Sequence, residues 1–114
     1  MIYTAKQGDI IWLDFDPQIG HEQKGRRPAV IVSNDIFNSF SKKAAMVCPI
    51  TNNNRGLPHH LSLDDRTNTS GVIMTDQAKI LDISNRRAEF IERLPEDLLL
   101  ELVDIIYSFI YYSG

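Results

Sequence analysis

Two hydrophobic periods follow one another along this chain, and their order constrains the fold most strongly. Short apolar runs, separated by turn-forming residues, continue as far as Ile83. After Pro95 the apolar residues recur at helical spacing up to Ile110. We therefore expect five or six short strands followed by one long helix. Irregular spacing and short connections favour a small, strongly bent antiparallel barrel over a parallel α/β sheet.

Each apolar run predicts one element. The expected strands are Ile10–Phe15, Ala29–Val32, Ala44–Ile50, His59–Leu63, Val72–Met74 and Lys79–Ile83. Ala29–Val32 is apolar on both faces, which predicts a central strand. Pro49 lacks a backbone donor and is expected at an edge or a bulge. Asn34 is expected to cap a short helical turn over Asp35–Phe40. The last helix is apolar over more than one stripe, so we expect it to be deeply buried or to pack against a partner.

The bulk composition is that of one ordinary globular domain, which we expect to span residues 1–114. Apolar residues make up 43% of the 114 and charged residues 24%. No apolar run approaches the roughly 20 residues that cross a bilayer, and the N-terminus lacks the apolar core of a signal peptide. A cytoplasmic location is therefore expected. The single cysteine, Cys48, excludes an internal disulfide and a cysteine-based metal site, and its apolar surroundings favour a buried structural thiol over a nucleophile.

Positive charge is concentrated in short stretches of a chain whose net charge is −3. The net value argues weakly against coating of nucleic acid. Lys24, Arg26 and Arg27 nevertheless lie close together in the sequence. Phosphate contacts depend on the local field, so a local basic face remains open.

The polar segment Gly20–Pro28, between the first two strands, holds most of the candidate chemistry. Arg27 offers a fork of donors that matches phosphate oxygens, and Glu22 could accept a proton from an attacking hydroxyl. His21 could exchange protons near neutral pH. Spacing alone favours the other interpretation, a loop-stabilising ion pair between Glu22 and Arg27 with a solvated His21.

Two later positions carry similar ambiguity. Thr51 ends an apolar strand and could donate to a phosphate or close its own turn. Asp76 could act as a base, and Gln77 could contact a nucleobase, although a turn-closing aspartate is also typical there. The pair His59-His60 is a weak metal signal, because neighbours on a strand point to opposite faces. No metal site is expected. Tyr107, Tyr111 and Tyr112 are expected to pack in the core or an interface.

Taken together, these motifs resemble the MazF/PemK (Kid-type) toxins of bacterial toxin–antitoxin systems. The similar segments are Gly8–Trp12, Asp14–Pro17, Gly20–Gln23, Gly25–Val32, Val47–Thr51, Gly71–Asp82 and Leu94–Glu96. The resemblance covers essentially the whole chain. It implies a mainly β fold with one C-terminal helix, an SH3-like, strongly bent antiparallel barrel of the PemK/CcdB type, that works as a homodimer. It also implies a sequence-specific endoribonuclease that cuts single-stranded RNA, commonly mRNA, and so inhibits translation.

The same resemblance implies a mechanism without metal or cofactor. The ribose 2′-hydroxyl attacks the phosphate and leaves a 2′,3′-cyclic phosphate and a 5′-hydroxyl. Arg27 and Thr51 would steady the scissile phosphate, and Glu22 would transfer a proton or orient Arg27. In the Kid branch, His21 would stabilise the phosphate and Asp76 would be the base. That branch has an arginine as general acid where this chain has Met74, so an Arg27-centred mechanism is favoured.

RNA contacts are expected from a wider set of polar residues. These are Gln23, Lys24, Arg26, Asn52, Asn53, Arg55, Gln77 and Lys79. An antitoxin partner is implied as well, whose acidic tail would lie across the groove holding Arg27. The alternative is a non-enzymatic, CcdB-like gyrase poison. Such proteins rely on a Trp-Gly-Ile C-terminus, whereas this chain ends in Tyr-Tyr-Ser-Gly.

Overall fold

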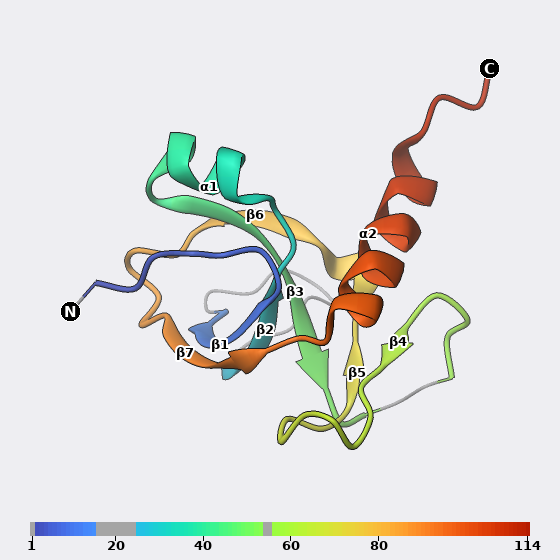
Figure 1. Ribbon diagram of the computed structural model, residues 1–114, viewed down its shortest axis with the longest axis horizontal. Helices are drawn as coiled ribbons and strands as arrows, with labels where there is room; N and C mark the ends of the chain where they lie inside the picture. The colour runs from blue at the N-terminus through green and yellow to red at the C-terminus, as the bar shows by residue number, and fades with distance from the viewer. Residues whose placement is uncertain (1, 16–24, 54–55) are drawn as a thin grey trace.

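The computed structural model, which describes residues 2–15, 25–53 and 56–114, shows a curled antiparallel sheet with a C-terminal helix (Figure 1). Its strands are β1 (Asp9–Asp14), β2 (Arg26–Ile31), β3 (Ala44–Thr51), β4 (Leu61–Ser62), β5 (Val72–Ile73), β6 (Lys79–Asp82) and β7 (Glu89–Arg93). The helices are α1 (Asp35–Ser41), the 3₁₀ turn η1 (Thr75–Gln77) and α2 (Glu96–Ile110). The strand order is β4-β5-β3-β2-β1-β7, and β6 also pairs with β3. This half-barrel with a final helix confirms the predicted fold class.

Strand β3 is the strand with the most partners in the described sheet. It pairs with β2 on one side, and on the other with β6 from Ala44 to Val47 and then with β5 from Ile50. Pro49 lies between the two partners, is fully buried, and accepts a hydrogen bond from the Met74 N–H at 2.9 Å. The prediction of an edge position for Pro49 is wrong. The missing donor is tolerated because it falls where β3 changes partners.

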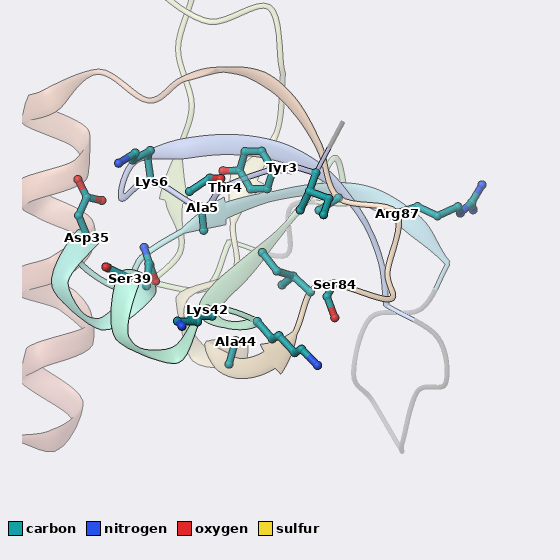
Figure 2. Close-up of a pocket in the computed structure, with 15 residues that line it drawn as sticks. Tyr3, Thr4, Ala5, Lys6, Asp35, Ser39, Lys42, Ala44, Ser84 and Arg87 are labelled. Carbon is teal, nitrogen blue, oxygen red and sulfur yellow. The ribbon is translucent and has the colours of Figure 1, made fainter.

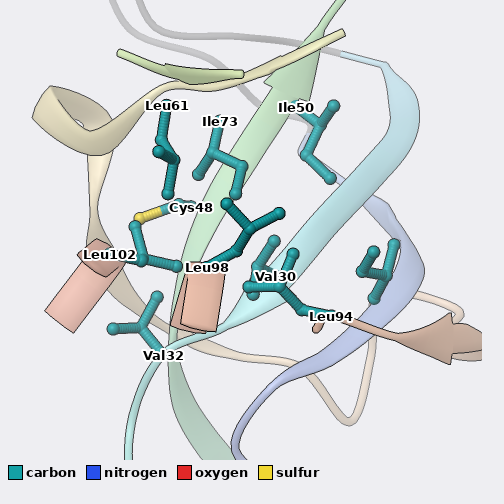
Figure 3. Packing of buried hydrophobic residues seen from close by; sticks show 10 residues of the cluster. Val30, Val32, Cys48, Ile50, Leu61, Ile73, Leu94, Leu98 and Leu102 are labelled. Carbon is teal, nitrogen blue, oxygen red and sulfur yellow. The ribbon is translucent and has the colours of Figure 1, made fainter. Parts of the chain in front are cut away.

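Two hydrophobic clusters cover the two faces of the sheet. One lies beneath α2 and includes Val30, Cys48 and Leu102, with Leu98 and Leu102 reaching down from the helix (Figure 3). The other lies on the opposite face and includes Leu13, Phe15, Ala29, Ile31 and Val47. Successive strand residues alternate between the faces, so one strand feeds both clusters. β2 is buried on both faces over its last three residues and pairs with a strand on each side, which confirms the predicted central strand.

The two helices begin as expected. The Asn34 side chain accepts a hydrogen bond from the Phe37 N–H at 2.8 Å and caps α1. Pro95 stands immediately before α2, where a missing N–H costs nothing. Of the residues within α2, only Leu98 and Leu102 are buried, whereas Tyr107 and Ile110 are exposed. The prediction that α2 is deeply buried is therefore wrong for this chain alone. Its packing against a partner remains a prediction.

Two segments differ from the predicted strands. β4 covers only Leu61–Ser62, and His59 and His60 belong to the turn before it. β7 was not predicted, because its charged residues hide the strand pattern. It pairs with β1 at the edge of the sheet, where Arg93 donates to the buried Asp9 at 2.7 Å. Across the described part of the chain, no helix is long and hydrophobic enough to cross a membrane.

The burial of α2 gives a first testable expectation. Leu102→Ala removes a side chain that is fully buried beneath the helix, and should lower the free energy of unfolding by about 2–5 kcal/mol. Ile36→Ala, on the exposed side of α1, should change it by less than about 0.5 kcal/mol. Urea denaturation at equal protein concentration measures both. Equal losses for the two variants would contradict this packing.

Candidate functional site

Eight of the predicted site residues lie within the described part of the chain. They are Arg26, Arg27, Thr51, Asn52, Asn53, Asp76, Gln77 and Lys79. The other five, His21, Glu22, Gln23, Lys24 and Arg55, lie outside the described residues. The geometry of the site is therefore built from the ends of β2 and β3, from η1 and from the start of β6.

Arg27 is oriented by strand pairing. It lies opposite Leu13 in the β1–β2 ladder, and cross-strand partners point to the same face of a sheet. Leu13 belongs to the hydrophobic cluster away from α2, as does Ala29, two residues after Arg27. The half-buried Arg27 side chain therefore leaves the sheet at the end of that cluster.

Thr51 is the last residue of β3, and the backbone at Gly71 packs closely against it. Only 8% of the residue is exposed, and its Oγ1 accepts a hydrogen bond from the Asn53 N–H at 3.1 Å. Gly71 has φ +115°, and a Cβ there would collide with the Thr51 carbonyl. Only glycine allows this close approach. An oxygen that accepts one bond still has its own proton to donate, so the Thr51 hydroxyl can serve an anionic ligand.

Lys79 completes a polar group that we call the basic edge (Arg27, Thr51 and Lys79). It lies opposite Val47 in the β3–β6 ladder, and its Nζ is 5.9 Å from the centre of the Phe15 ring. Val47 and Phe15 belong to the same cluster as Leu13. Alternation along β3 from Val47 places Thr51 on this face as well. Two cations and a hydroxyl thus lie on the same face of the sheet, an arrangement suited to phosphate.

Arg26 points away from the basic edge. Its guanidinium donates to the Arg87 carbonyl at 2.8 Å and to Glu89 Oε1 at 3.1 Å. These contacts tie β2 to the segment around β7. The structure therefore gives Arg26 a structural role, and its contact with RNA stays a prediction.

A hollow of about 360 Å³ lies next to the end of β3. Asn52 lines it, and its Oδ1 accepts a hydrogen bond from the Ser70 hydroxyl at 3.0 Å. The other lining residues are Trp12, Pro28, Asn68, Thr69, Ser70 and Ile91. Trp12 is 39% exposed and was not among the predicted site residues. The sequence feature that could have indicated it is the position of Trp12 in β1, two residues before Asp14 and on the same side of the strand.

Asp76 lies in η1 and has two histidine neighbours. His60 Nε2 is 2.9 Å from Asp76 Oδ1, and His59 Nε2 is 3.7 Å from Oδ2. Partial burial works to raise the pKa of the Asp76 carboxyl, but the hydrogen bond with His60 and attraction to both imidazoles outweigh it, so the pKa lies below its usual value. The prediction that the two histidines point to opposite faces is wrong, because a turn and not a strand carries them.

Two side chains lie close to Asp76. Met74 is 7% exposed and carries no ionisable group. Burial, followed by the charge of Asp76, raises the pKa of the Cys48 thiol to about 12. A thiol with that pKa is not a nucleophile at neutral pH, in agreement with a structural role.

A larger hollow, of about 570 Å³, lies between the N-terminal segment and α1. Figure 2 shows Lys6, Lys42 and Arg87 around it, together with Asp35. None of the described site candidates lines this hollow. The basic edge and the hollow beside Asn52 are therefore the better candidates for the predicted chemistry.

Comparison with known proteins gives one consistent result. Residues 6–110 match the family of PemK-like, MazF-like toxins of type II toxin–antitoxin systems. The chain is 40% identical over 78 residues to the endoribonuclease toxin MazF of Escherichia coli K12, which covers 68% of each chain. It is 33% identical over 102 residues to the endoribonuclease PemK of Escherichia coli, covering 86% of this chain and 76% of PemK.

Comparison with solved structures gives the same family. MazF from Deinococcus radiodurans superposes with a TM-score of 0.87 at 36% identity, covering 94% of this chain and 96% of that one. A MazE–MazF complex from the same organism superposes with a TM-score of 0.81 at 31% identity, covering 97% and 99%. The fold, the ordered motifs and the match across nearly the whole length lead to one conclusion: the chain belongs to the PemK-like, MazF-like toxins of type II toxin–antitoxin systems.

Proposed function

We propose that this chain is a sequence-specific endoribonuclease toxin that cleaves single-stranded RNA, with mRNA as the main substrate, without a metal ion. Similar proteins named endoribonucleases and membership of the toxin family support the reaction class. The observation that best supports the assignment is the basic edge, whose members Arg27, Thr51 and Lys79 lie on one face of the sheet. That grouping offers a scissile phosphate both charge and a hydroxyl donor.

The proposed reaction uses the ribose as its own nucleophile. A base removes the 2′-hydroxyl proton, and the 2′-oxygen forms a bond to phosphorus. The bond from phosphorus to the 5′-oxygen breaks, and an acid protonates the leaving oxygen. The products are a 2′,3′-cyclic phosphate and a 5′-hydroxyl. Negative charge grows on the phosphate oxygens during this step, and Arg27 and the Thr51 hydroxyl would stabilise it there.

The remaining catalytic candidates are proposed to transfer the protons. Glu22 and His21, from the segment before β2, are proposed to exchange the protons or orient Arg27. Asp76 is a weaker candidate for the base, because a carboxylate with a lowered pKa has less tendency to take up a proton at neutral pH. Its two imidazole partners lie toward α2, where the His59 ring meets Phe109.

The remaining RNA contacts would follow the surface beside the basic edge. The hollow lined by Trp12 and Asn52 combines an exposed aromatic face with an amide, which suits an unstacked base. Asn53, Gln77, Arg55, Gln23, Lys24 and Arg26 are the further proposed contacts. The protein would act in the bacterial cytoplasm, where its substrate is made.

Arg27→Ala should reduce cleavage by about 100-fold or more, since it removes the charged donor at the phosphate. Thr51→Val, which keeps the shape and removes one donor, should cost about tenfold. The measurement is cleavage of a long defined RNA in excess chelator, with the 5′ ends mapped to identify the recognition motif.

Lys43→Ala is the matched control, because Lys43 is an exposed cation beside the larger hollow. It should cut like wild type. Cleavage that required added Mg²⁺, or equal activity of Arg27→Ala and wild type, would overturn the mechanism. No cutting by any form would favour the CcdB-like binding function instead.

An antitoxin is the second proposed partner, as in the MazE–MazF complexes to which the structure is similar. Its acidic tail would lie over the basic edge and displace RNA, because opposite charges attract across such a surface. Arg27→Glu should therefore weaken antitoxin binding at least tenfold, whereas Lys43→Glu should not. Titration calorimetry with the cognate antitoxin measures both. Unchanged affinity of the Arg27 variant would exclude this binding mode.

A homodimer is proposed from the exposed apolar side of α2. Leu100, Tyr107 and Ile110 are 60%, 63% and 73% exposed, which is unusual for a helix that must stay in water. Ile110→Asp should shift the protein toward monomer, whereas Ile36→Asp, on α1, should not. Light scattering at low micromolar concentration reports the mass. A wild-type protein that is monomeric there would refute the dimer.

A further inference from the structure

Two histidines and an aspartate from separate segments converge at one point beside α2. His59 and His60 belong to the turn before β4, and Asp76 belongs to η1. One nitrogen or oxygen from each of the three side chains lies within 4.8 Å of the other two. Both Nε2 atoms face the same carboxylate, at 2.9 Å from Oδ1 and 3.7 Å from Oδ2.

The surrounding contacts hold this group in place. The Thr75 hydroxyl donates to the His59 carbonyl at 2.8 Å, which ties the turn to η1. The Phe109 ring meets the His59 ring edge-on, with centroids 5.7 Å apart. The His60 side chain is 4% exposed, and Asp76 remains open to solvent at 43%. The three side chains therefore form a preorganised group with one open side.

The described residues do not satisfy the hydrogen bonding of this group. His59 Nε2 is buried and has no hydrogen-bond partner among the described residues. Its 3.7 Å separation from Asp76 Oδ2 is too long for a hydrogen bond. A neutral imidazole nitrogen there presents either an unpaired proton or a lone pair directed at a carboxylate. The lone pair facing the carboxylate is the unfavourable arrangement, and a cation between the three atoms would relieve it once the ring proton lies on Nδ1.

We propose that His59, His60 and Asp76 form a binding site for a divalent cation of the zinc type. Two imidazole nitrogens and a carboxylate oxygen are a ligand set that zinc accepts, with a fourth position open to water. Tetrahedral ligands at zinc distances lie about 3.3 Å apart, and the two separations of 2.9 and 3.7 Å bracket that value. Small side-chain rotations would admit the ion.

The outer environment sets the expected strength of binding. His60 Nδ1, which would carry the proton when Nε2 binds metal, is buried without a partner among the described residues. Metal-binding histidines that lack such an outer hydrogen bond typically lose 10–100-fold in affinity. We therefore expect reversible binding, weaker than at a structural zinc site. The ion would clamp the turn to η1 and is not needed for the proposed RNA cleavage.

The test uses purified full-length protein treated with chelator and then freed of it. Titration calorimetry with Zn²⁺ should show one saturable site per chain. Co²⁺ should give the visible absorption of a tetrahedral complex. Asp76→Asn, which changes one atom of a partly exposed side chain, and His59→Ala should each weaken Zn²⁺ binding at least tenfold.

Two control variants make the result specific. Asp65→Asn alters another exposed carboxylate, and His21→Ala removes the only histidine outside the pair. Both should bind Zn²⁺ like wild type, and circular dichroism without metal should show all four variants folded. Absence of saturable Zn²⁺ binding by wild type would overturn the proposal. Equal binding by wild type, Asp76→Asn and His59→Ala would overturn it as well, because the ion would then lie elsewhere.

Discussion

The change of partner along β3 is the constraint on which the rest of the structure depends. Up to Val47 the strand pairs with β6, and from Ile50 it pairs with β5. The buried Pro49 stands between, where a ladder hydrogen bond is not required. The sheet can curl at this point without leaving a buried donor unpaired. The curl gives the half-barrel one cluster beneath α2 and another on its opposite face.

The same strand determines where the chemistry lies. Alternation along β3 sends Val47 and Thr51 to one face and Cys48 and Ile50 to the other. The first face carries the basic edge, because Arg27 and Lys79 are cross-strand partners of residues in that cluster. The second face leads to η1, whose Asp76 meets the histidines near α2. One strand thus separates the basic edge, proposed to bind phosphate, from the three side chains proposed to bind a metal ion.

Sequence patterns predicted the structural features that depend on residues close together in the chain. The doubly apolar run in β2, the Asn34 cap and the start of α2 all follow from local chemistry, and the structure confirms them. The order of the motifs was also sufficient to predict the family. The prediction that Arg27 and Thr51 act together came from the family resemblance. The spacing of the two residues in the sequence would not have suggested it.

The errors arose where tertiary contacts decide. His59 and His60 read as a strand, but a turn directs both rings at Asp76, a contact between residues 16 positions apart. β7 was missed because its pairing with β1 offsets its charged, exposed sequence. Of the two expectations for the apolar α2, deep burial is wrong because only one side of the helix reaches the sheet, and packing against a partner stays a prediction. Trp12 lines a hollow together with Asn68 and Ser70, residues more than 50 positions away that its sequence neighbours do not reveal.

The central claim is that the basic edge supports attack by the ribose 2′-hydroxyl. Its most direct test is cleavage of two otherwise identical RNAs, one of which carries a 2′-deoxy nucleotide at the mapped cutting site. The account predicts that wild-type protein cuts only the all-ribose RNA, and that mass spectrometry finds a 2′,3′-cyclic phosphate on the upstream product. Cleavage of the deoxy-substituted RNA at the same position would contradict it.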